Sequence, residues 1–283
     1  MVRKKSKHTK LINFLLLFSL AFTVFAFSFV NSNAAAKTPE YIAHRGWSTR
    51  APENTLPAFR LAVKNKVFYG VEFDIWESSA QTSGDPLLLV MHDENIQRMC
   101  GVNKSIRKIT RKSLGKYTII SGSKVNKYPN LKIPTADEAL RTIWENSSRA
   151  IPVIELKHRL SDRAMNYLFD LIGDNKVVII SFEYNAVTDA VKMAKKRGVS
   201  DNVKTMYLLS KLPSGKYKST ARKLKRAGID CISLKYTGVT KRTVKAFHKQ
   251  GIKVCTWTVP NKKAAGKLAG MGVDYITANG KVY

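Results

Sequence analysis

The sequence predicts an α/β fold, a (β/α)8 TIM barrel with a small insertion after the third strand. Short apolar runs alternate with amphipathic segments throughout residues 37–283, and this order is typical of a parallel sheet covered by helices. About eight repeats within roughly 245 residues fit a closed barrel better than an open, doubly wound sheet. One long segment without this alternation, 93–132, indicates the insertion.

Nine apolar runs are candidate strands, and most of them are separated by helix-like stretches. The strand candidates are 40–43, 70–75, 87–91, 151–156, 177–182, 203–209, 229–234, 252–259 and 273–277. The helix candidates are 55–65, 135–146, 161–173, 185–196, 217–227, 240–249 and 261–270. Because a barrel of this kind has eight strands, we expect one candidate to be irregular, either 229–234 or 273–277.

The segment 93–132 is rich in Lys, Gly and Ser and has only weak periodicity. It follows the third strand candidate, on the side of a barrel where active sites form. A connection of this length inside a compact domain is usually functional, so we expect it to border the site. A surface excursion with a small sheet or helix of its own is the alternative.

The first 36 residues have the layout of an export signal. Five basic residues between Arg3 and Lys10 precede an uncharged apolar run, 11–30, and small polar residues follow up to Ala36. This order predicts a signal peptide at 1–36, or an N-terminal membrane anchor, because about 20 apolar residues can span a bilayer. In either case we expect the remaining chain to be extracellular, secreted or anchored.

The chain is strongly basic. Residues 1–36 hold five of its 49 Lys and Arg and none of its 20 Asp and Glu, so residues 37–283 carry a net charge of +24. Such a surface attracts polyanions over about 10 Å at moderate salt. We expect an anionic membrane or a teichoic-acid-like polymer as partner, unless the charge reflects only a lysine-rich composition. No interleaved aromatic residues indicate a specific nucleic-acid partner.

The three cysteines do not indicate a covalent framework. Cys100, Cys231 and Cys255 have no spacing typical of a zinc site or of paired disulfides. Cys231 and Cys255 both lie in candidate strands and could pair, but we expect each thiol to be buried and unpaired.

Three carboxylates indicate a metal site. In the motif GVEFDIW, Glu72 and Asp74 share one face of their strand, since side chains alternate along a strand. Paired carboxylates in an apolar strand repel each other and lose solvation, so they require a cation or strong donors. Glu155 supplies a third oxygen ligand, and such ligands suit one divalent cation, Ca²⁺ or Mg²⁺. Salt bridges to the abundant lysines are the alternative.

Cationic and imidazole side chains lie at other strand ends: His44, Arg45, His92 and Lys157. In a parallel barrel the strand ends converge on one face, where active sites lie. Two imidazoles can divide acid and base roles, and fixed cations can match the charge that develops on phosphate oxygens. The set predicts phosphodiester cleavage. Trp257 either lines the cavity, against an alcohol or glycerol group, or packs in the core.

Eight motifs occur in this order: AHRG, PENT, EFD, MHD, IPT, IELK, TWTV and GVDYIT. Together they make residues 40–280 resemble the glycerophosphodiester phosphodiesterase family. The resemblance implies a TIM barrel that uses one divalent metal to hydrolyse glycerophosphodiesters to sn-glycerol 3-phosphate and an alcohol. It also implies the roles of the matching residues, which are His44 and His92 in acid/base catalysis, Glu72, Asp74 and Glu155 in metal ligation, and Arg45 and Lys157 at the phosphate.

Two stretches depart from the family pattern. After the acidic strand the family usually continues with a Thr-x-Asp-Gly turn, whereas this chain reads IWESSAQTSGDP, so we expect a different substrate rim. The family's Thr-Asp pair near the end is Thr277-Ala278 here, a change expected to affect only contacts that close the barrel. No residue of the expected chemistry is missing, so we predict an active enzyme.

Two other functions are compatible with the sequence. One is a phospholipase D-like phosphodiesterase acting on sphingo- or lysophospholipids, which would use a similar residue set. The other is a non-catalytic barrel that binds a wall or a membrane through its positive charge. The nucleophile also stays open: it is either water or the substrate's own 2-hydroxyl, which would give a cyclic phosphate first.

Overall fold

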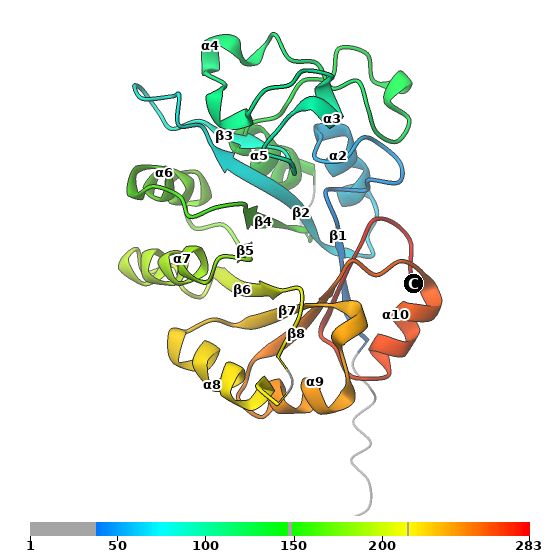
Figure 1. Ribbon diagram of the computed structural model, residues 1–283. Helices are drawn as coiled ribbons and strands as arrows, with labels where there is room; N and C mark the ends of the chain where they lie inside the picture. Colours follow the sequence, from blue (N-terminus) through cyan, green and yellow to red (C-terminus); the bar gives the residue numbers. More distant parts are fainter. Residues whose placement is uncertain (1–37, 147–148, 214) are drawn as a thin grey trace, which may run out of the picture. The chain divides into compact units, whose positions relative to one another are not determined.

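The chain folds as a closed barrel in the computed structural model, which describes residues 38–146, 149–213 and 215–283 (Figure 1). Eight parallel strands close on themselves, because β1 pairs with both β2 and β9. The barrel strands are β1 (Glu40–Ala43), β2 (Phe68–Glu77), β4 (Ile151–Leu156), β5 (Val177–Ser181), β6 (Val203–Leu209), β7 (Cys231–Lys235), β8 (Lys253–Trp257) and β9 (Tyr275–Ala278). The predicted (β/α)8 fold is confirmed.

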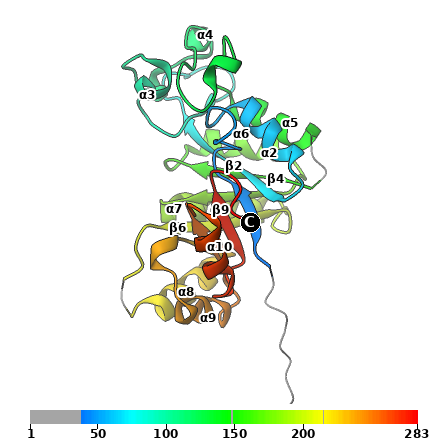
Figure 2. The same ribbon diagram turned by 90° about the vertical axis from the view of Figure 1, so that its right-hand side faces the viewer.

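Helices cover the outside of the barrel (Figure 2). They are α2 (Leu56–Lys64), α5 (Ala136–Asn146), α6 (Asp162–Ile172), α7 (Tyr184–Lys196), α8 (Tyr217–Ala227), α9 (Lys241–His248) and α10 (Lys262–Ala269). Several begin where a short polar side chain accepts a hydrogen bond from a backbone N–H of the first turn, as at Thr55, Ser161 and Asn261. Local sequence therefore sets these helix starts.

The ninth strand, β3 (Leu88–Val90), does not belong to the barrel. It runs antiparallel to the last part of β2 and pairs Val90 with Ile75. The expectation that 229–234 or 273–277 is irregular was wrong, since both regions form regular parallel barrel strands. The ten-residue β2 is long enough to pair with β4 and also to offer its end to the returning chain.

The insertion has a small core of its own. Beside β3 it contains α3 (Gln97–Cys100), α4 (Arg111–Leu114) and two 3-10 helices, η1 (Ile106–Lys108) and η2 (Val125–Lys127). Its buried apolar side chains are Leu87, Leu89, Met91, Ile96, Met99, Cys100, Ile106, Ile109, Ile119 and Ile133. Such short elements explain the weak periodicity of 93–132, and the insertion also borders the site described below.

Apolar side chains fill the interior of the barrel: Ile42, Val153, Val178, Ile180, Met206, Leu208, Cys231, Cys255 and Tyr275. The interior is therefore a packed core rather than a channel, and it forms the floor of a site at the C-terminal end of the strands. All three cysteines are buried and unpaired, as expected.

Residues 1–37 lie outside the described part of the chain. The signal peptide or membrane anchor at 1–36, with its apolar run 11–30, therefore stays a prediction. Within 38–146, 149–213 and 215–283, no helix is both long and apolar enough to cross a membrane.

Candidate active site

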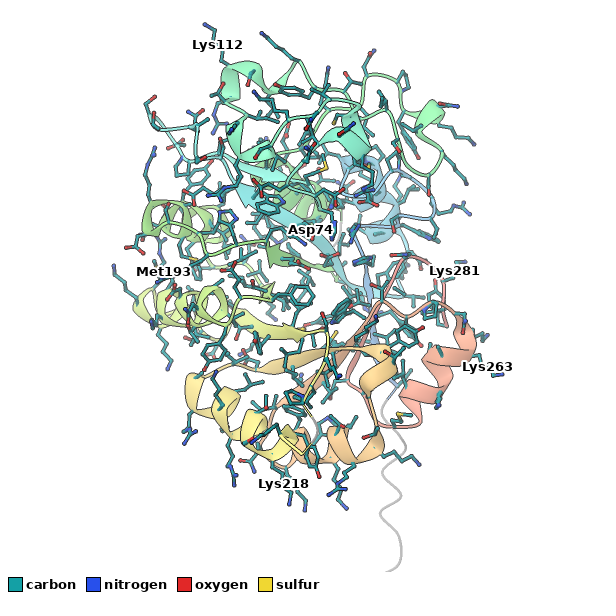
Figure 3. The ribbon with its side chains drawn as sticks, viewed as in Figure 1. Asp74, Lys112, Met193, Lys218, Lys263 and Lys281 are labelled. Atoms are coloured by element: carbon teal, nitrogen blue, oxygen red, sulfur yellow. The ribbon has the colours of Figure 1, made fainter. Side chains whose placement is uncertain are left out.

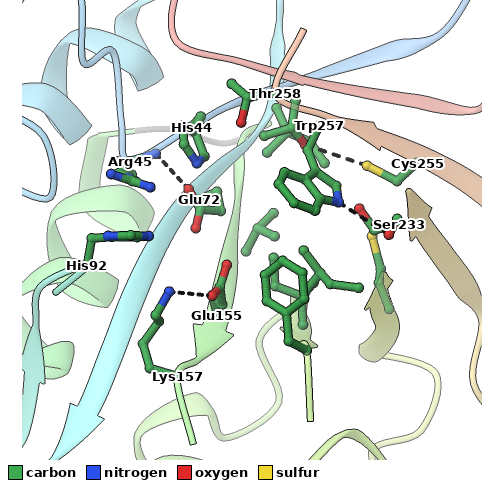
Figure 4. A pocket seen from close by; sticks show the side chains of 17 residues that line it. His44, Arg45, Glu72, His92, Glu155, Lys157, Ser233, Cys255, Trp257 and Thr258 are labelled. Carbon is green, nitrogen blue, oxygen red and sulfur yellow. Dashed lines mark hydrogen bonds and ion pairs between the residues drawn. The ribbon is translucent and has the colours of Figure 1, made fainter. Parts of the chain in front are cut away.

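A cavity with about 540 Å³ of empty space opens at the C-terminal ends of the barrel strands. The residues predicted for the site line it, namely His44, Arg45, Glu72, His92, Glu155, Lys157 and Trp257. Asp74, labelled in the middle of the barrel in Figure 3, lies buried against Lys157. Figure 4 shows the charged side chains on one side of the cavity and Trp257 on the other.

Two adjacent strands bring the three carboxylates together. Glu72 and Asp74 lie two residues apart on β2, and Glu155 on β4 pairs in register with Asp74. One oxygen atom from each residue lies within 4.8 Å of the others, and all three residues are buried. Parallel pairing of β2 with β4 therefore assembles the predicted acidic cluster.

Burial opposes three full negative charges on the acidic cluster. Burial and the charges of Asp74 and Glu155 raise the pKa of Glu72 well above its usual value. Burial and Asp74 likewise raise the pKa of Glu155 to about 7. Among the described residues, the buried Oε1 atom of Glu72 has no hydrogen-bond partner. An unpartnered carboxylate oxygen beside two further carboxylates fits a hard divalent cation.

Two basic side chains contact the acidic cluster. Nζ of Lys157 lies 2.7 Å from Oε1 of Glu155 and 3.3 Å from Oδ1 of Asp74. Nε of Arg45 lies 3.6 Å from Oδ2 of Asp74. Burial raises the pKa of Asp74, but the charges of Lys157 and Arg45 outweigh burial and hold that pKa below its usual value. Since both basic residues line the cavity, they can also contact an anion that enters it.

A strained turn after β1 directs Arg45 at the acidic cluster. Arg45 has a φ of 55°, in the left-handed region that non-glycine residues rarely adopt. Its backbone N–H donates a hydrogen bond to Oε2 of Glu72 at 2.7 Å. Gly46 follows with a φ of 75°, and a Cβ atom there would lie 2.8 Å from Ala58. Backbone geometry therefore requires glycine at position 46, whereas Arg45 adopts a strained conformation for which its side-chain chemistry is the reason.

Asn54 holds Asp74 in place, a role that was not anticipated from the sequence. Its Nδ2 donates to Oδ2 of Asp74 at 2.7 Å, and its Oδ1 accepts from the backbone N–H of Asp74 at 3.2 Å. Asn54 is buried and has a φ of 56°, a conformation that asparagine tolerates better than most residues. The neighbouring Thr55 caps α2, so the PENT motif leaves the Asn54 amide available for Asp74.

Asn279, just after β9, orients His44. Nδ1 of His44 lies 2.6 Å from Oδ1 of Asn279, and since a carbonyl oxygen only accepts, His44 carries its proton on Nδ1. Burial and the charge of Arg45 lower the pKa of His44 to about 4. The carbonyl of Ala278 does accept from the backbone N–H of His44, a contact that closes the barrel as expected. The contact of Asn279, the next residue, with His44 was not anticipated from the sequence.

His92 follows β3, which is not one of the barrel strands. Because β3 returns along β2, the backbone N–H of Met91 reaches the carbonyl of Asp74 at 3.1 Å, and His92 follows it. Nδ1 of His92 lies 2.7 Å from the carboxylate of Asp93, which can only accept, so His92 also carries a proton on Nδ1. The indole N–H of Trp76 donates to the carbonyl of His92 at 3.4 Å. The predicted convergence is correct, although the delivering strand is antiparallel.

Arg98 of α3 contacts the two carboxylates that hold His92 and Arg45, a role that was not anticipated. Its Nε atom lies 2.5 Å from Oδ2 of Asp93, which holds His92. Its Nη2 atom lies 2.7 Å from Oε1 of Glu53, and the same oxygen accepts from Nη1 of Arg45 at 3.0 Å. One guanidinium group therefore positions His92 and Arg45, each through one carboxylate. Glu53 therefore contacts both Arg98 of the insertion and Arg45 of the site.

Aromatic side chains form the apolar wall opposite the charges. Trp257, at the end of β8, donates its indole N–H to the carbonyl of Ser233 at 3.3 Å. Its ring meets Phe182 edge to face, with ring centroids 5.2 Å apart and an interplanar angle of 88°. Phe182 is 40% exposed and was not anticipated. Trp257 therefore lies in the cavity wall, the first of its two expected positions.

The barrel and its site define a class of enzyme: hydrolases that cleave phosphoric diesters at the C-terminal mouth of a (β/α)8 barrel. The model of the glycerophosphoryl diester phosphodiesterase family matches residues 44–279. The chain belongs to this family, and it is an enzyme that hydrolyses glycerophosphodiesters.

Two relatives of known sequence agree with this membership, and one solved structure has a similar fold. YhdW of Bacillus subtilis (strain 168) is 27% identical over 243 residues, which cover 84% of this chain and 93% of YhdW. A glycerophosphodiester phosphodiesterase of Bacillus altitudinis is 27% identical over 240 residues, covering 83% of this chain and 91% of that protein. A phosphodiesterase structure from Oleispira antarctica, in complex with the product sn-glycerol 3-phosphate, has a similar fold. Its TM-score is 0.71 at 23% identity, and the match covers 87% of this chain and 95% of that chain.

Replacing Arg98 by Met is expected to lower kcat for glycerophosphocholine roughly 10–100-fold. Arg98 holds Asp93, and Asp93 is the hydrogen-bond partner that orients His92. KM is expected to rise as well, because Arg45 loses a fixed contact through Glu53. Arg98→Lys should recover only part of kcat, since lysine lacks the planar fork that bridges two carboxylates. Steady-state kinetics measure both constants. The control is Arg111→Met, an exposed arginine of the same insertion, and a wild-type kcat in Arg98→Met would contradict the positioning role.

Proposed function

We propose that this protein hydrolyses glycerophosphodiesters to sn-glycerol 3-phosphate and an alcohol outside the cell, using one divalent cation and two histidines. The observation that carries the proposal is the buried acidic cluster, which lies beside two imidazoles and two basic side chains at one cavity. The product present in the Oleispira antarctica structure supports the product named here.

Glu72, Asp74 and Glu155 would hold the cation, Ca²⁺ or Mg²⁺, because they offer only oxygen ligands. When bound, the cation would act as a Lewis acid that neutralises charge on a phosphate oxygen. Arg45 and Lys157 supply further positive charge from fixed positions in the cavity wall. Their side chains would contact phosphate oxygens, where negative charge develops in the transition state.

The two histidines have different partners, which suit different roles. His44 bonds the neutral amide of Asn279, and its lowered pKa keeps it unprotonated at neutral pH, so we assign it as the general base. His92 bonds the carboxylate of Asp93 through Nδ1, which orients the ring at the cavity, so we assign it as the general acid for the departing alcohol. The base acts on water, or on the 2-hydroxyl of the substrate when a cyclic phosphate forms first.

The apolar wall favours a small diester with carbon groups on either side of the phosphate. Trp257 and Phe182 would contact the glycerol or the alcohol through their rings. The cavity lies between this apolar wall and the charged side chains, so it can contact both the carbon groups and the phosphate of such a diester. No observation favours a phospholipase D-like activity on sphingo- or lysophospholipids, or a non-catalytic binding barrel.

The composition of residues 1–36 supports a location outside the cell, because a basic start, an apolar run and a small-residue end form an export signal. The barrel would then be secreted, or anchored by residues 11–30. The net charge of +24 over residues 37–283 supports an anionic membrane or a teichoic-acid-like polymer as a further partner.

Removing the cation with EDTA is expected to abolish release of glycerol 3-phosphate from glycerophosphocholine, and added Ca²⁺ or Mg²⁺ should restore it. Because the pKa of Glu155 is raised to about 7, protons compete with the cation below that pH. Lowering the pH from about 8 to about 6 should therefore raise the cation concentration required for half-maximal activity roughly tenfold. Full activity in EDTA would contradict the metal dependence. Absence of hydrolysis with either cation would contradict the proposed activity.

A further inference from the structure

The positive charge of this protein is concentrated in one part of the chain. Residues 202–273 contain 17 Lys and Arg but one acidic residue, Asp230. Residues 37–201 contain 26 Lys and Arg together with 18 Asp and Glu. A lysine-rich composition would act on the whole chain, so it does not account for this contrast.

We call the surface that the cations of this segment occupy the basic face. All 17 are exposed, and they lie on α8, α9, α10 and the adjoining strands and loops: Lys204, Lys211, Lys216, Lys218, Arg222, Lys223, Lys225, Arg226, Lys235, Lys241, Arg242, Lys245, Lys249, Lys253, Lys262, Lys263 and Lys267. Figure 3 shows Lys218 and Lys263 directed away from the barrel. Within the described chain, Lys204 alone among them has a carboxylate within reach, that of Asp230 at 3.9 Å.

The basic face lies on the opposite side of the barrel from the insertion. Helices α8 and α9 occupy one end of both views, and α4 lies at the other end (Figures 1 and 2). The two surfaces can therefore be changed independently by mutation.

A groove follows α9 on the basic face, with about 1090 Å³ of empty space. Lys241, Lys245 and Lys249 line one side of it, and the turn Met271–Asp274 lines the other. The three lysines are four residues apart, so each lies about 6 Å from the next along the helix axis. Asp274 in the groove is already bonded to His248, at 2.7 Å. Cations repeated at this spacing fit a ligand whose anionic groups repeat along a chain.

The basic face also reaches the rim of the catalytic cavity. Lys211, Lys235 and Lys262 each follow, within four residues, a residue that lines the cavity. Lys211 lies in the loop after β6, Lys235 is the last residue of β7, and Lys262 is the first residue of α10, so all three lie on the side of the barrel where the cavity opens. An anionic chain that enters the cavity by one end therefore meets cations along the path towards α9.

We propose that the basic face and its groove bind a phosphodiester polymer, such as a chain of glycerol phosphate, and guide its end into the cavity. The inference rests on the proposed function, because each link of such a chain is a glycerophosphodiester. A flexible polymer can follow the curved outer surface of α8, α9 and α10, and release of its counterions favours binding.

The exposed apolar residues favour a polymer over a bilayer as the ligand. Surfaces that insert into a bilayer carry exposed aromatic or aliphatic anchors beside their cations. In the described part of the chain the large exposed apolar residues are Val67, Val102, Ile120 and Phe182, and none of them lies on α8, α9 or α10.

Two triple variants of equal charge test this proposal. The groove variant is Lys241→Gln, Lys245→Gln and Lys249→Gln. The control is Lys112→Gln, Lys116→Gln and Lys127→Gln, three exposed lysines of the insertion. Binding is measured with labelled inorganic polyphosphate by fluorescence anisotropy. The groove variant should lose about tenfold or more in affinity, and the slope of log affinity against log salt should weaken by about 2. The control should stay within about twofold of the wild type.

Turnover of glycerophosphocholine separates this proposal from the proposed function. Both triple variants should retain the wild-type kcat/KM, because none of the six lysines lines the cavity. If the wild type does not hydrolyse glycerophosphocholine while the groove variant alone loses polyphosphate affinity, the proposed function fails and the binding surface stands. Equal losses of polyphosphate affinity in both triple variants, or no polyphosphate affinity in the wild type, would contradict the proposed binding surface. If the groove lysines bind phosphatidylglycerol vesicles more tightly than polyphosphate, the ligand of the basic face is a membrane, and the proposed polymer binding is wrong.

Discussion

His44→Ala and His92→Ala are each expected to lower kcat for glycerophosphocholine by roughly 10²–10⁴-fold while the barrel stays folded. Each substitution removes an imidazole that lines the cavity, and neither side chain belongs to the apolar core. The matched control is His248→Ala, since His248 bonds Asp274 outside the cavity and should retain activity. Steady-state kinetics give kcat, and thermal unfolding shows whether the fold is kept.

The two histidine variants should differ when the leaving group is p-nitrophenol. That group departs as an anion and requires no protonation, so a diester carrying it bypasses a general acid. His92→Ala should recover most of its activity on this substrate, whereas His44→Ala should not. Equal recovery in both variants would contradict the assigned roles. Full activity of either variant on glycerophosphocholine would remove that histidine from the mechanism.

Glu72→Gln is expected to weaken binding of Ca²⁺ or Mg²⁺ more than about 100-fold and to abolish turnover, because loss of a direct ligand should exceed the effect of losing a supporting contact. Oε1 of Glu72 has no hydrogen-bond partner among the described residues and lies in the cluster proposed for the cation, so the substitution removes a carboxylate ligand. Without metal, the variant should resist urea better than the wild type, since it relieves repulsion from Asp74 and Glu155.

Titration calorimetry measures the cation affinity of Glu72→Gln, and urea unfolding in EDTA measures its stability. Glu77→Gln is the matched control on the same strand, because Glu77 bonds Ser161 at the rim rather than a member of the acidic cluster. It should retain cation binding and turnover. Unchanged cation affinity in Glu72→Gln, or lower urea resistance in EDTA, would show that the acidic cluster is a structural ion-pair network instead.

The chemistry of the site could be predicted because it depends on local patterns. Glu72 and Asp74 share a face through alternation along one strand, and this property requires no knowledge of other strands. His44 and Glu155 could be assigned to the same site because the C-terminal strand ends of a parallel barrel converge on one face, the mouth of the barrel. His92 was assigned to that mouth as well, but the reason given, that it ends a third parallel barrel strand, was wrong, because β3 is antiparallel.

The supporting contacts could not be predicted, because they join residues distant in sequence through side-chain geometry. His44 and Asn279 are 235 positions apart, and their contact exists only once the barrel has closed between β1 and β9. Arg98 reaches Glu53 across 45 positions, after the insertion has folded on its own core. No periodicity or motif encodes the conformation of these side chains.

The sequence alone determined the barrel, the family resemblance and the residues that carry charge and acid/base chemistry, because hydrophobic period and strand-end position are local properties of the chain. Only the tertiary structure decided that β3 is antiparallel, that Asn54 and Asn279 orient Asp74 and His44, and that one guanidinium positions both His92 and Arg45. The physical reason is that such hydrogen bonds depend on angles and distances of a few ångströms, which are set by packing across the whole barrel.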